Sequence, residues 1–294
     1  MYKEILSLLK CPSCNGKLSL AIEKEENSEI VEGNLSCKDG HQWAIREGVI
    51  NFGSVEQEII NNWSEAFEKY DEEELSKRMS EANPKNLTQL VDKTGKFIID
   101  NINNNENKFI LDIATGTGGL FIEMVKQLKG EVQIICTDLS FVVLGYDRLK
   151  AKRINPEIKV NYIACDATNL PFKDYTIDAA TSFFGIANML NLAEGGLKEA
   201  KRVLKTGQSF FDSYIVIKEE SNGFKMLKEF CEENQVVGAE EFTIKTGIKK
   251  AYNDMSFHST EMVAIGESIG EKSDSDLIPF EGEWFGVVVA KSIK

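Results

Sequence analysis

A glycine-rich turn directly after an apolar run is the feature of this sequence best suited to bind a ligand. The run Ile110–Ile113 contains Asp112, and Gly116 and Gly118 follow it at alternate positions. Glycines leave backbone atoms uncovered, so a ligand can approach the chain closely at such a turn. Helical spacing of apolar residues over 120–128 then predicts a strand, a turn and a helix, the first unit of a nucleotide-cofactor α/β domain. The spacing is not Gly-x-Gly-x-x-Gly, so a dinucleotide is not the first expectation.

Two further acidic residues stand where later strands are expected to end. Asp138 comes 26 residues after Asp112, and Asp166 follows the next apolar run. Open α/β sheets bind ligands at the carboxyl ends of their strands, so these acids are expected at one edge. Asp138 would accept hydrogen bonds from both ribose hydroxyls of an adenosine cofactor, and Asp166 one from the adenine amino group. The predicted cofactor-binding residues are Asp112, Ala114, Thr115, Gly116, Gly118, Asp138, Leu139, Asp166, Ala167 and Phe183.

Each of these elements alone has a plainer explanation. A lone Gly-x-Gly turn is often only a tight connection, and a lone strand-end aspartate is often a helix cap. Asp138 could itself cap the helix expected after it. Their combination at successive strand ends favours the cofactor interpretation.

Four potential metal ligands lie close together near the N-terminus. Cys11-Pro-Ser-Cys14 is followed 23 residues later by Cys37-Lys-Asp-Gly-His41. Zinc prefers a tetrahedron of thiolates and imidazoles, and each such pair forms a knuckle on a tight turn. We predict a closed, structural zinc site formed by Cys11, Cys14, Cys37 and His41. The alternative is a set of free cysteines in a small β unit.

The secondary structure expected around these residues is an alternation of strands and helices. Strands are predicted at 109–113, 133–137, 159–164, 177–182, 208–217 and 284–290, with helices near 119–129, 140–153 and 194–204. This rhythm predicts an α/β fold with a mainly parallel sheet covered on both faces. Short strands at 18–22, 29–35 and 43–45 would form a β module too small to be stable on its own core, so it needs a cross-link such as a structural metal.

Three regions are therefore expected along the chain. Residues 1–52 form the metal-binding β module, 53–107 a helical linker or lid, and 108–294 the cofactor domain. Within the linker, Trp63, Phe67 and Tyr70 share one helical face, which either caps the cofactor pocket or packs in the core.

Composition limits the partners and the compartment. The 294 residues carry a net charge of −13, with 42% hydrophobic and 28% charged residues, as in a globular protein. Nucleic acids and anionic membranes attract basic surfaces, so this balance disfavours both. No apolar run reaches the roughly 18 residues of a membrane helix, and Met1–Ile5 does not resemble a signal peptide. A cytoplasmic protein is expected.

The cofactor motifs resemble those of a known enzyme class. Asp112-x-Ala-x-Gly116-x-Gly118 resembles motif I of the class I S-adenosylmethionine (SAM) methyltransferases. Residues 166–180 and 199–207 resemble the methyltransferase-11 group, and 114–118 and 184–189 are similar to the ubiquinone/menaquinone C-methyltransferases. The resemblance implies a Rossmann-like class I methyltransferase sheet, SAM as cofactor and methyl transfer as the reaction. The sequence departs from that family at Ala187, where an arginine is usual, which argues against a quinone-type substrate.

The N-terminal module resembles a second group of proteins. Its pattern is similar to small zinc-ribbon partners of methyltransferases and to the zinc module of the ribosomal RNA large-subunit guanine methyltransferases. That resemblance implies a ribosomal or transfer RNA substrate. Residues 1–50, however, carry six Lys/Arg against eight Asp/Glu, which favours a packing element or substrate-covering lid.

Three functions remain open at this stage. The first is methyl transfer from SAM to a small molecule, and the second is methylation of an RNA base with the zinc module recognising the substrate. The third is a SAM-binding regulatory or scaffold subunit without turnover. A methyl on a sulfonium is already activated, so positioning can supply much of the rate and no catalytic dyad is expected. His258, the only histidine outside the metal pattern, is the single weak candidate for a general base.

Overall fold

The computed structural model describes residues 1–53, 69, 74, 77–78, 81–272 and 278–294. The predicted aromatic face of Trp63, Phe67 and Tyr70 lies outside the described residues.

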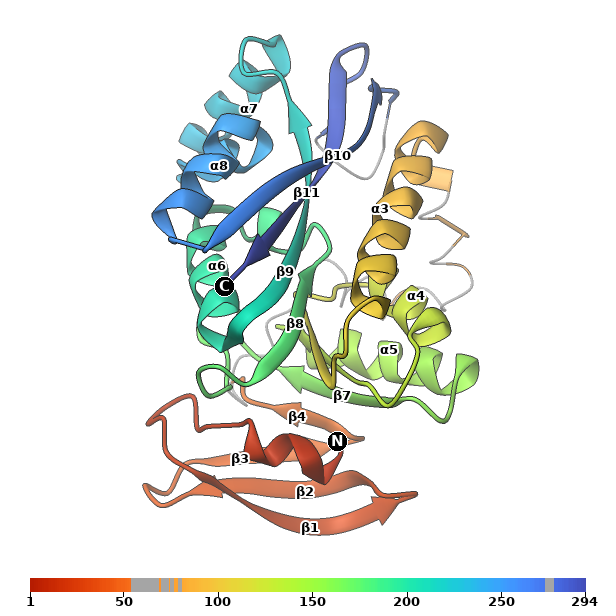
Figure 1. Cartoon of the computed structure of the whole chain (residues 1–294), viewed down its shortest axis with the longest axis vertical. Helices are drawn as coiled ribbons and strands as arrows, with labels where there is room; N and C mark the ends of the chain where they lie inside the picture. The colour runs from red at the N-terminus through yellow and green to blue at the C-terminus, as the bar shows by residue number, and fades with distance from the viewer. Residues whose placement is uncertain (54–68, 70–73, 75–76, 79–80, 273–277) are drawn as a thin grey trace.

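One continuous sheet runs through the described part of the chain (Figure 1). Its eleven strands lie in the order β1-β2-β3-β4-β7-β6-β5-β8-β9-β11-β10. Their bounds are β1 Leu18–Glu26, β2 Glu29–Cys37, β3 Gln42–Arg46, β4 Val49–Asn51, β5 Phe109–Ile113, β6 Gln133–Asp138, β7 Lys159–Ala164, β8 Ile177–Ser182, β9 Leu204–Ile217, β10 Ser259–Ile269 and β11 Trp284–Ile293.

The centre of the sheet is parallel. β4, β7, β6, β5, β8 and β9 all pair in parallel, whereas β11 and β10 close one side in antiparallel register. Every residue of β5 and of β8 is buried, as expected for parallel strands that are covered on both faces.

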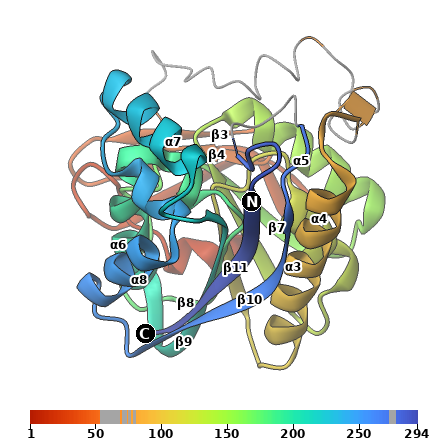
Figure 2. The same cartoon turned by 90° about the horizontal axis from the view of Figure 1, so that it is seen from above.

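Helices cover the two faces of this sheet. Their bounds are α3 Lys85–Asn103, α4 Gly119–Gln127, α5 Phe141–Ile154, α6 Ala193–Val203, α7 Asn222–Glu233 and α8 Lys245–Asp254, with 3-10 turns η1 Lys3–Ser7, η2 Ile186–Leu192 and η3 Ala239–Thr243. Figure 2 shows α3, α4 and α5 on one side and α6, α7 and α8 on the other. One buried cluster joins α3, α4 and α5 to the sheet, and another joins α6 and α8 to it. The predicted α/β fold with two covered faces is confirmed.

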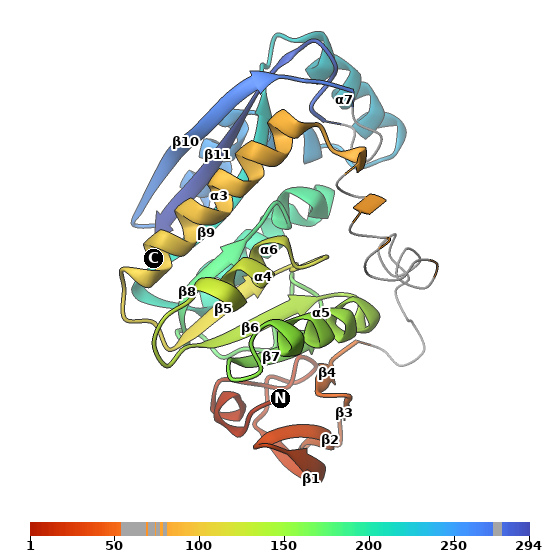
Figure 3. The same cartoon turned by 90° about the vertical axis from the view of Figure 1, so that its right-hand side faces the viewer.

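The N-terminal strands extend this sheet. β4 pairs with β7 in parallel register, with Ile50 opposite Ile163, and the module lies beneath β7 in Figure 3. A buried ion pair reinforces the junction: Arg148 Nε donates to Glu29 Oε1 at 2.8 Å. The domain boundaries stay a prediction, but the module and the cofactor region share one sheet.

Most predicted strands and helices agree with the structure to within a few residues. The main omissions are β10 and the helices α7 and α8, which lie in or near the weakly patterned stretch 240–280. Apolar and polar residues do not alternate clearly along β10, because both faces of this strand are exposed or half-exposed. No described helix combines the length and the apolar character needed to cross a lipid bilayer.

Candidate cofactor pocket and metal cluster

The glycine turn lies between the carboxyl end of β5 and the start of α4. Gly116 and Gly118 have φ values of 59° and 78°, the left-handed region in which glycine is unstrained. A Cβ on Gly118 would also lie 2.7 Å from Asp147 Oδ1, so both conformation and space exclude a side chain there. The Thr115 amide donates to the Thr137 carbonyl at 2.9 Å, which joins the turn to β6.

Asp138 connects the end of β6 to that turn. Its Oδ2 accepts from the Gly116 amide and its Oδ1 from the Ser140 amide, each at 2.9 Å. The N-cap of α5 is Ser140, whose hydroxyl accepts from the Val143 amide at 3.2 Å. The alternative of Asp138 as the cap is therefore wrong. Burial raises the pKa of Asp138, although the backbone hydrogen bonds oppose this shift.

Asp112 lies inside the protein and not on the surface of the turn. It is 1% exposed, and its Oδ1 accepts from the Thr181 hydroxyl of β8 at 2.7 Å. Desolvation raises the pKa of this carboxyl to about 6, against the hydrogen bond from Thr181. Its backbone carbonyl accepts from the Thr137 hydroxyl at 3.0 Å. Asp112 thus ties β5 to both of its neighbouring strands.

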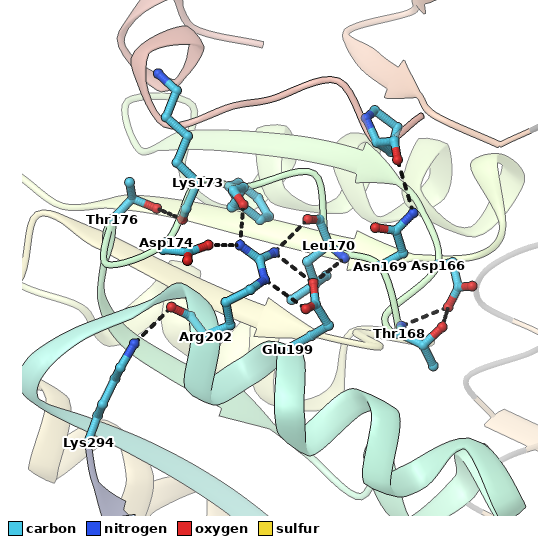
Figure 4. Close-up of polar contacts among 12 residues, drawn as sticks. Asp166, Thr168, Asn169, Leu170, Lys173, Asp174, Thr176, Glu199, Arg202 and Lys294 are labelled. Atoms are coloured by element: carbon cyan, nitrogen blue, oxygen red, sulfur yellow. Dashed lines mark hydrogen bonds and ion pairs between the residues drawn. The ribbon is translucent and has the colours of Figure 1, made fainter. Parts of the chain in front are cut away.

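Asp166 is exposed directly after β7. Its Oδ1 accepts from both the amide and the hydroxyl of Thr168, at 2.7 and 2.8 Å (Figure 4). These bonds orient the carboxylate, and Oδ2 takes no part in them. Ala167, beside it, is half-buried against the core.

Two aromatic residues follow β8 at the same edge of the sheet. The rings of Phe183 and Phe184 meet edge-on with centroids 4.8 Å apart. Phe183 lies against Gly119 at the start of α4, and the Phe184 amide donates to the Ser213 hydroxyl at 2.9 Å. An apolar wall therefore stands next to the glycine turn.

The predicted cofactor residues thus come from the carboxyl ends of four adjacent strands, β7, β6, β5 and β8. Leu139, 46% exposed, lies at the end of β6, and Ala114, half-buried, at the end of β5. The structure brings these residues to one edge. Their contacts with a cofactor remain a proposal.

The four predicted metal ligands also meet. The ligand atoms of Cys11, Cys14, Cys37 and His41 all lie within 4.8 Å of one another. Sγ of Cys14 is 3.6 Å from Sγ of Cys37, which is 3.3 Å from Nδ1 of His41. Zn–S bonds of about 2.3 Å in a tetrahedron would place two sulfurs about 3.8 Å apart, so the cluster fits zinc.

His258 does not join the cofactor site. It is exposed, and its amide donates to the Ile293 carbonyl at 2.8 Å, where β11 pairs with the first half of β9. That position is the amino edge of the parallel strands, opposite the glycine turn. The role of His258 as a general base stays a prediction, and its position lies away from the predicted cofactor residues.

Sequence reasoning missed two buried groups near the site. Asp147 of α5 is fully buried beside Gly118, and neither of its carboxyl oxygens accepts a hydrogen bond from the described residues. Asp212 of β9 is fully buried, and its Oδ2 accepts from the hydroxyls of Tyr214 and Tyr252. Neither position carries a local sequence signal, because each carboxyl is enclosed by elements distant along the chain.

A third omission is the arginine at the end of α6. Figure 4 shows Arg202 bonded to Glu199, Asp174 and the loop after β7. The sequence signal is the stretch 199–207, whose resemblance to methyltransferases indicates no role for Arg202.

Comparison with known proteins agrees with this arrangement. Residues 87–227 match the model of the ubiE/COQ5 methyltransferase family. This segment is similar to that family. The segment contains the glycine turn, all three strand-end acids and the aromatic wall.

Curated relatives match over a similar region. A demethylmenaquinone methyltransferase of Porphyromonas gingivalis is 36% identical over 98 residues, 33% of this chain and 40% of that protein. The ubiquinone/menaquinone biosynthesis C-methyltransferase UbiE of Geotalea uraniireducens is 35% identical over 115 residues, 38% of this chain and 48% of that protein. The chain thus spans less than half the length of these relatives.

Solved structures include a SAM dependent methyltransferase from Aquifex aeolicus, with 17% identity and a TM-score of 0.49. The comparison covers 74% of this chain and 98% of that one. A likeness of this size carries no information about function.

Proposed function

We propose that this protein is a SAM-dependent methyltransferase that acts on a small-molecule acceptor. The observation that carries the proposal is Asp138, held to the Gly116 amide at the carboxyl edge of a segment that matches a methyltransferase family. A strand-end carboxylate beside a bare glycine turn suits an adenosine ribose without a 2′-phosphate.

Each residue of the edge has a proposed part in holding SAM. Asp138 accepts hydrogen bonds from the ribose hydroxyls. Asp166 accepts one from the adenine amino group through Oδ2, because Thr168 bonds only Oδ1. Gly116 and Gly118 let the methionine part approach the backbone, and Phe183 forms the apolar wall. Asp112, being buried, acts by fixing the strands under the turn.

SAM supplies a methyl group on a positively charged sulfur, ready for in-line transfer to a nucleophile. The protein's part is to align the acceptor and to exclude water, which can supply a large share of the rate. With His258 at the opposite edge, no described residue is assigned as a general base.

A small-molecule acceptor fits the charge better than RNA does. The net charge of −13 and the acidic balance of residues 1–50 both oppose a polyanion. The named relatives are quinone-pathway methyltransferases. Ala187, however, stands at the first turn of η2, and the resemblance noted from the sequence implies an arginine at this position. We therefore propose a small-molecule substrate without assigning a quinone.

We also propose that Cys11, Cys14, Cys37 and His41 bind one structural zinc ion. All four ligand positions come from the protein, so no position is open for catalysis. RNA methylation remains the second candidate, since the zinc module resembles that of RNA enzymes.

Transfer of labelled methyl from SAM into a cell extract tests the proposal. Products are separated by size before and after ribonuclease treatment, with the Asp138→Ala variant as the control for SAM-dependent labelling. Label in a small, ribonuclease-resistant fraction is the expected result. Label in large material that ribonuclease releases would establish the RNA enzyme instead. Tight SAM binding with no labelled product in any extract would favour a regulatory subunit.

A further inference from the structure

The loop between β7 and β8 carries Asp166, the residue proposed to contact adenine. Within the loop, the Asn169 amide donates to the Asp166 carbonyl at 3.0 Å, and Thr168 bonds the Asp166 carboxylate. The turn is closed on itself, so the orientation of Asp166 depends on what holds Asn169 and the residues after it.

The α6 side of the loop is held by one ion-paired arginine. Arg202 Nη2 donates to the Leu170 carbonyl at 2.9 Å and Nη1 to the Phe172 carbonyl at 2.6 Å. Glu199, itself bonded to Arg202, accepts from the Leu170 amide at 2.8 Å (Figure 4). The second half of the loop is therefore fixed to the core of the protein.

The other side of the same loop is held by the metal knuckle. Asn169 Nδ2 donates to the Pro12 carbonyl at 3.3 Å, and the Lys10 amide donates to the Pro171 carbonyl at 3.0 Å. Cys11, a ligand of the cluster, is the residue between Lys10 and Pro12. The residues immediately before and after a predicted metal ligand therefore each make one of these two hydrogen bonds.

A bound metal would fix the conformation of this backbone. An isolated module of about 50 residues rarely has a sufficient core of its own, and the free energy of binding a structural zinc is largely folding free energy. When Cys11 is anchored, the positions of Lys10 and Pro12 are set, and with them the partners of Pro171 and Asn169.

We propose that the metal knuckle positions the Asp166–Asn169 turn, so that zinc binding and SAM binding are thermodynamically coupled. The inference rests on the proposed function of both sites. Coupling of this kind is reciprocal: zinc raises the affinity for SAM, and SAM raises the affinity for zinc by the same factor.

The test uses the full chain and S-adenosylhomocysteine, the demethylated product, as the probe. Calorimetry measures its Kd with zinc-loaded and zinc-stripped protein. A chelator competition measures zinc affinity with and without the probe. Coupling factors of about 5–150-fold are usual, so zinc removal should weaken probe binding at least about 5-fold, and the probe should tighten zinc binding equally.

Two variants keep the test valid if the stripped protein unfolds. Asn169→Ala removes the bond to Pro12 without touching a ligand. It should keep full zinc content yet weaken probe binding about 3-fold or more, and it should reduce the coupling factor. Lys3→Ala removes only an exposed ion pair with Glu25 in the same module and should match the wild type in both respects.

The outcomes separate the two proposals. If zinc-loaded protein fails to bind the probe, the proposed function fails. If the probe binds with a Kd that does not depend on zinc, and Asn169→Ala binds the probe as Lys3→Ala does, the coupling is overturned. The methyltransferase proposal then still stands.

Discussion

At the scale of single residues, position in the fold separates three carboxyls that look alike in sequence. Asp138 is only half-buried at the sheet edge and bonds to backbone amides of two turns, whereas Asp112 and Asp212 are fully enclosed and bond to neighbouring hydroxyls. The distinction matters because an enclosed carboxyl affects stability, whereas one at the edge affects binding.

Asp138→Ala should weaken SAM binding at least about 10-fold, since a charged hydrogen-bond acceptor contributes about 1.5–3 kcal/mol. The variant also frees the Gly116 amide, which loosens the turn. Calorimetry with SAM measures the effect, and Glu131→Ala, an exposed acid on the loop before β6, is the control. Affinity equal to the wild type would remove Asp138 from the site.

Asp212 should make stability depend on pH. Burial raises its pKa from 3.8 to about 7, although hydrogen bonds from Tyr214 and Tyr252 oppose the shift. The folded protein keeps this proton up to about pH 7, while the unfolded chain loses it near 3.8. The free energy of unfolding therefore falls as the pH rises through this window.

Asp212→Asn should remove that part of the pH dependence, because an amide does not ionise and its oxygen still accepts from both tyrosines. Relative to the wild type, the variant should gain about 2–3 kcal/mol between pH 5 and pH 8, at about 1.4 kcal/mol per pKa unit. Urea unfolding at the two pH values measures this gain. An equal difference between variant and wild type at both would contradict the assignment.

At the scale of elements, two short segments do most of the positioning. The glycine turn holds the ends of β5 and β6 together, and the two cysteine turns bring the four potential metal ligands of the small β module together. Both could be predicted because each depends on residues of special chemistry at short spacing.

Cys37→Ser should reduce the zinc content well below one ion per chain and destabilise the first 50 residues, because a weaker ligand replaces a thiolate. Elemental analysis of purified protein measures the metal, and limited proteolysis reports the state of the module. Lys38→Ala, next to the ligand and exposed, should keep full zinc. Full occupancy in Cys37→Ser would exclude the cluster as the site.

At the scale of the whole molecule, the N-terminal module is an extension of the sheet. Glu29 is 4% exposed at this junction and bonds Arg148 and Lys152 of α5. Burial opposes its ionisation, but the cations of α5 prevail and the pKa of Glu29 is lowered.

Glu29→Gln should therefore cost about 3–5 kcal/mol of unfolding free energy, since Arg148 would remain buried without its counter-charge. Denaturant unfolding at pH 7 measures the loss. The matched control is Glu25→Gln, whose partner Lys3 is exposed and whose pair is expected to contribute about 0–1 kcal/mol. A loss no larger than that of the control would show that the junction does not depend on this pair.

The sequence by itself determined the local units of this protein. Apolar periodicity identified the parallel strands, glycine spacing identified the turn at Gly116, and cysteine spacing identified the metal cluster. These features depend on neighbours a few residues apart, so they can be read from the chain directly.

Only the tertiary structure decided how those units meet. It joined β4 to β7, placed His258 at the edge opposite the glycine turn, enclosed Asp212, and brought Pro12 to Asn169 across 157 residues of sequence. No local pattern encodes such contacts, because they arise when separately formed elements pack and bury their remaining polar groups against one another.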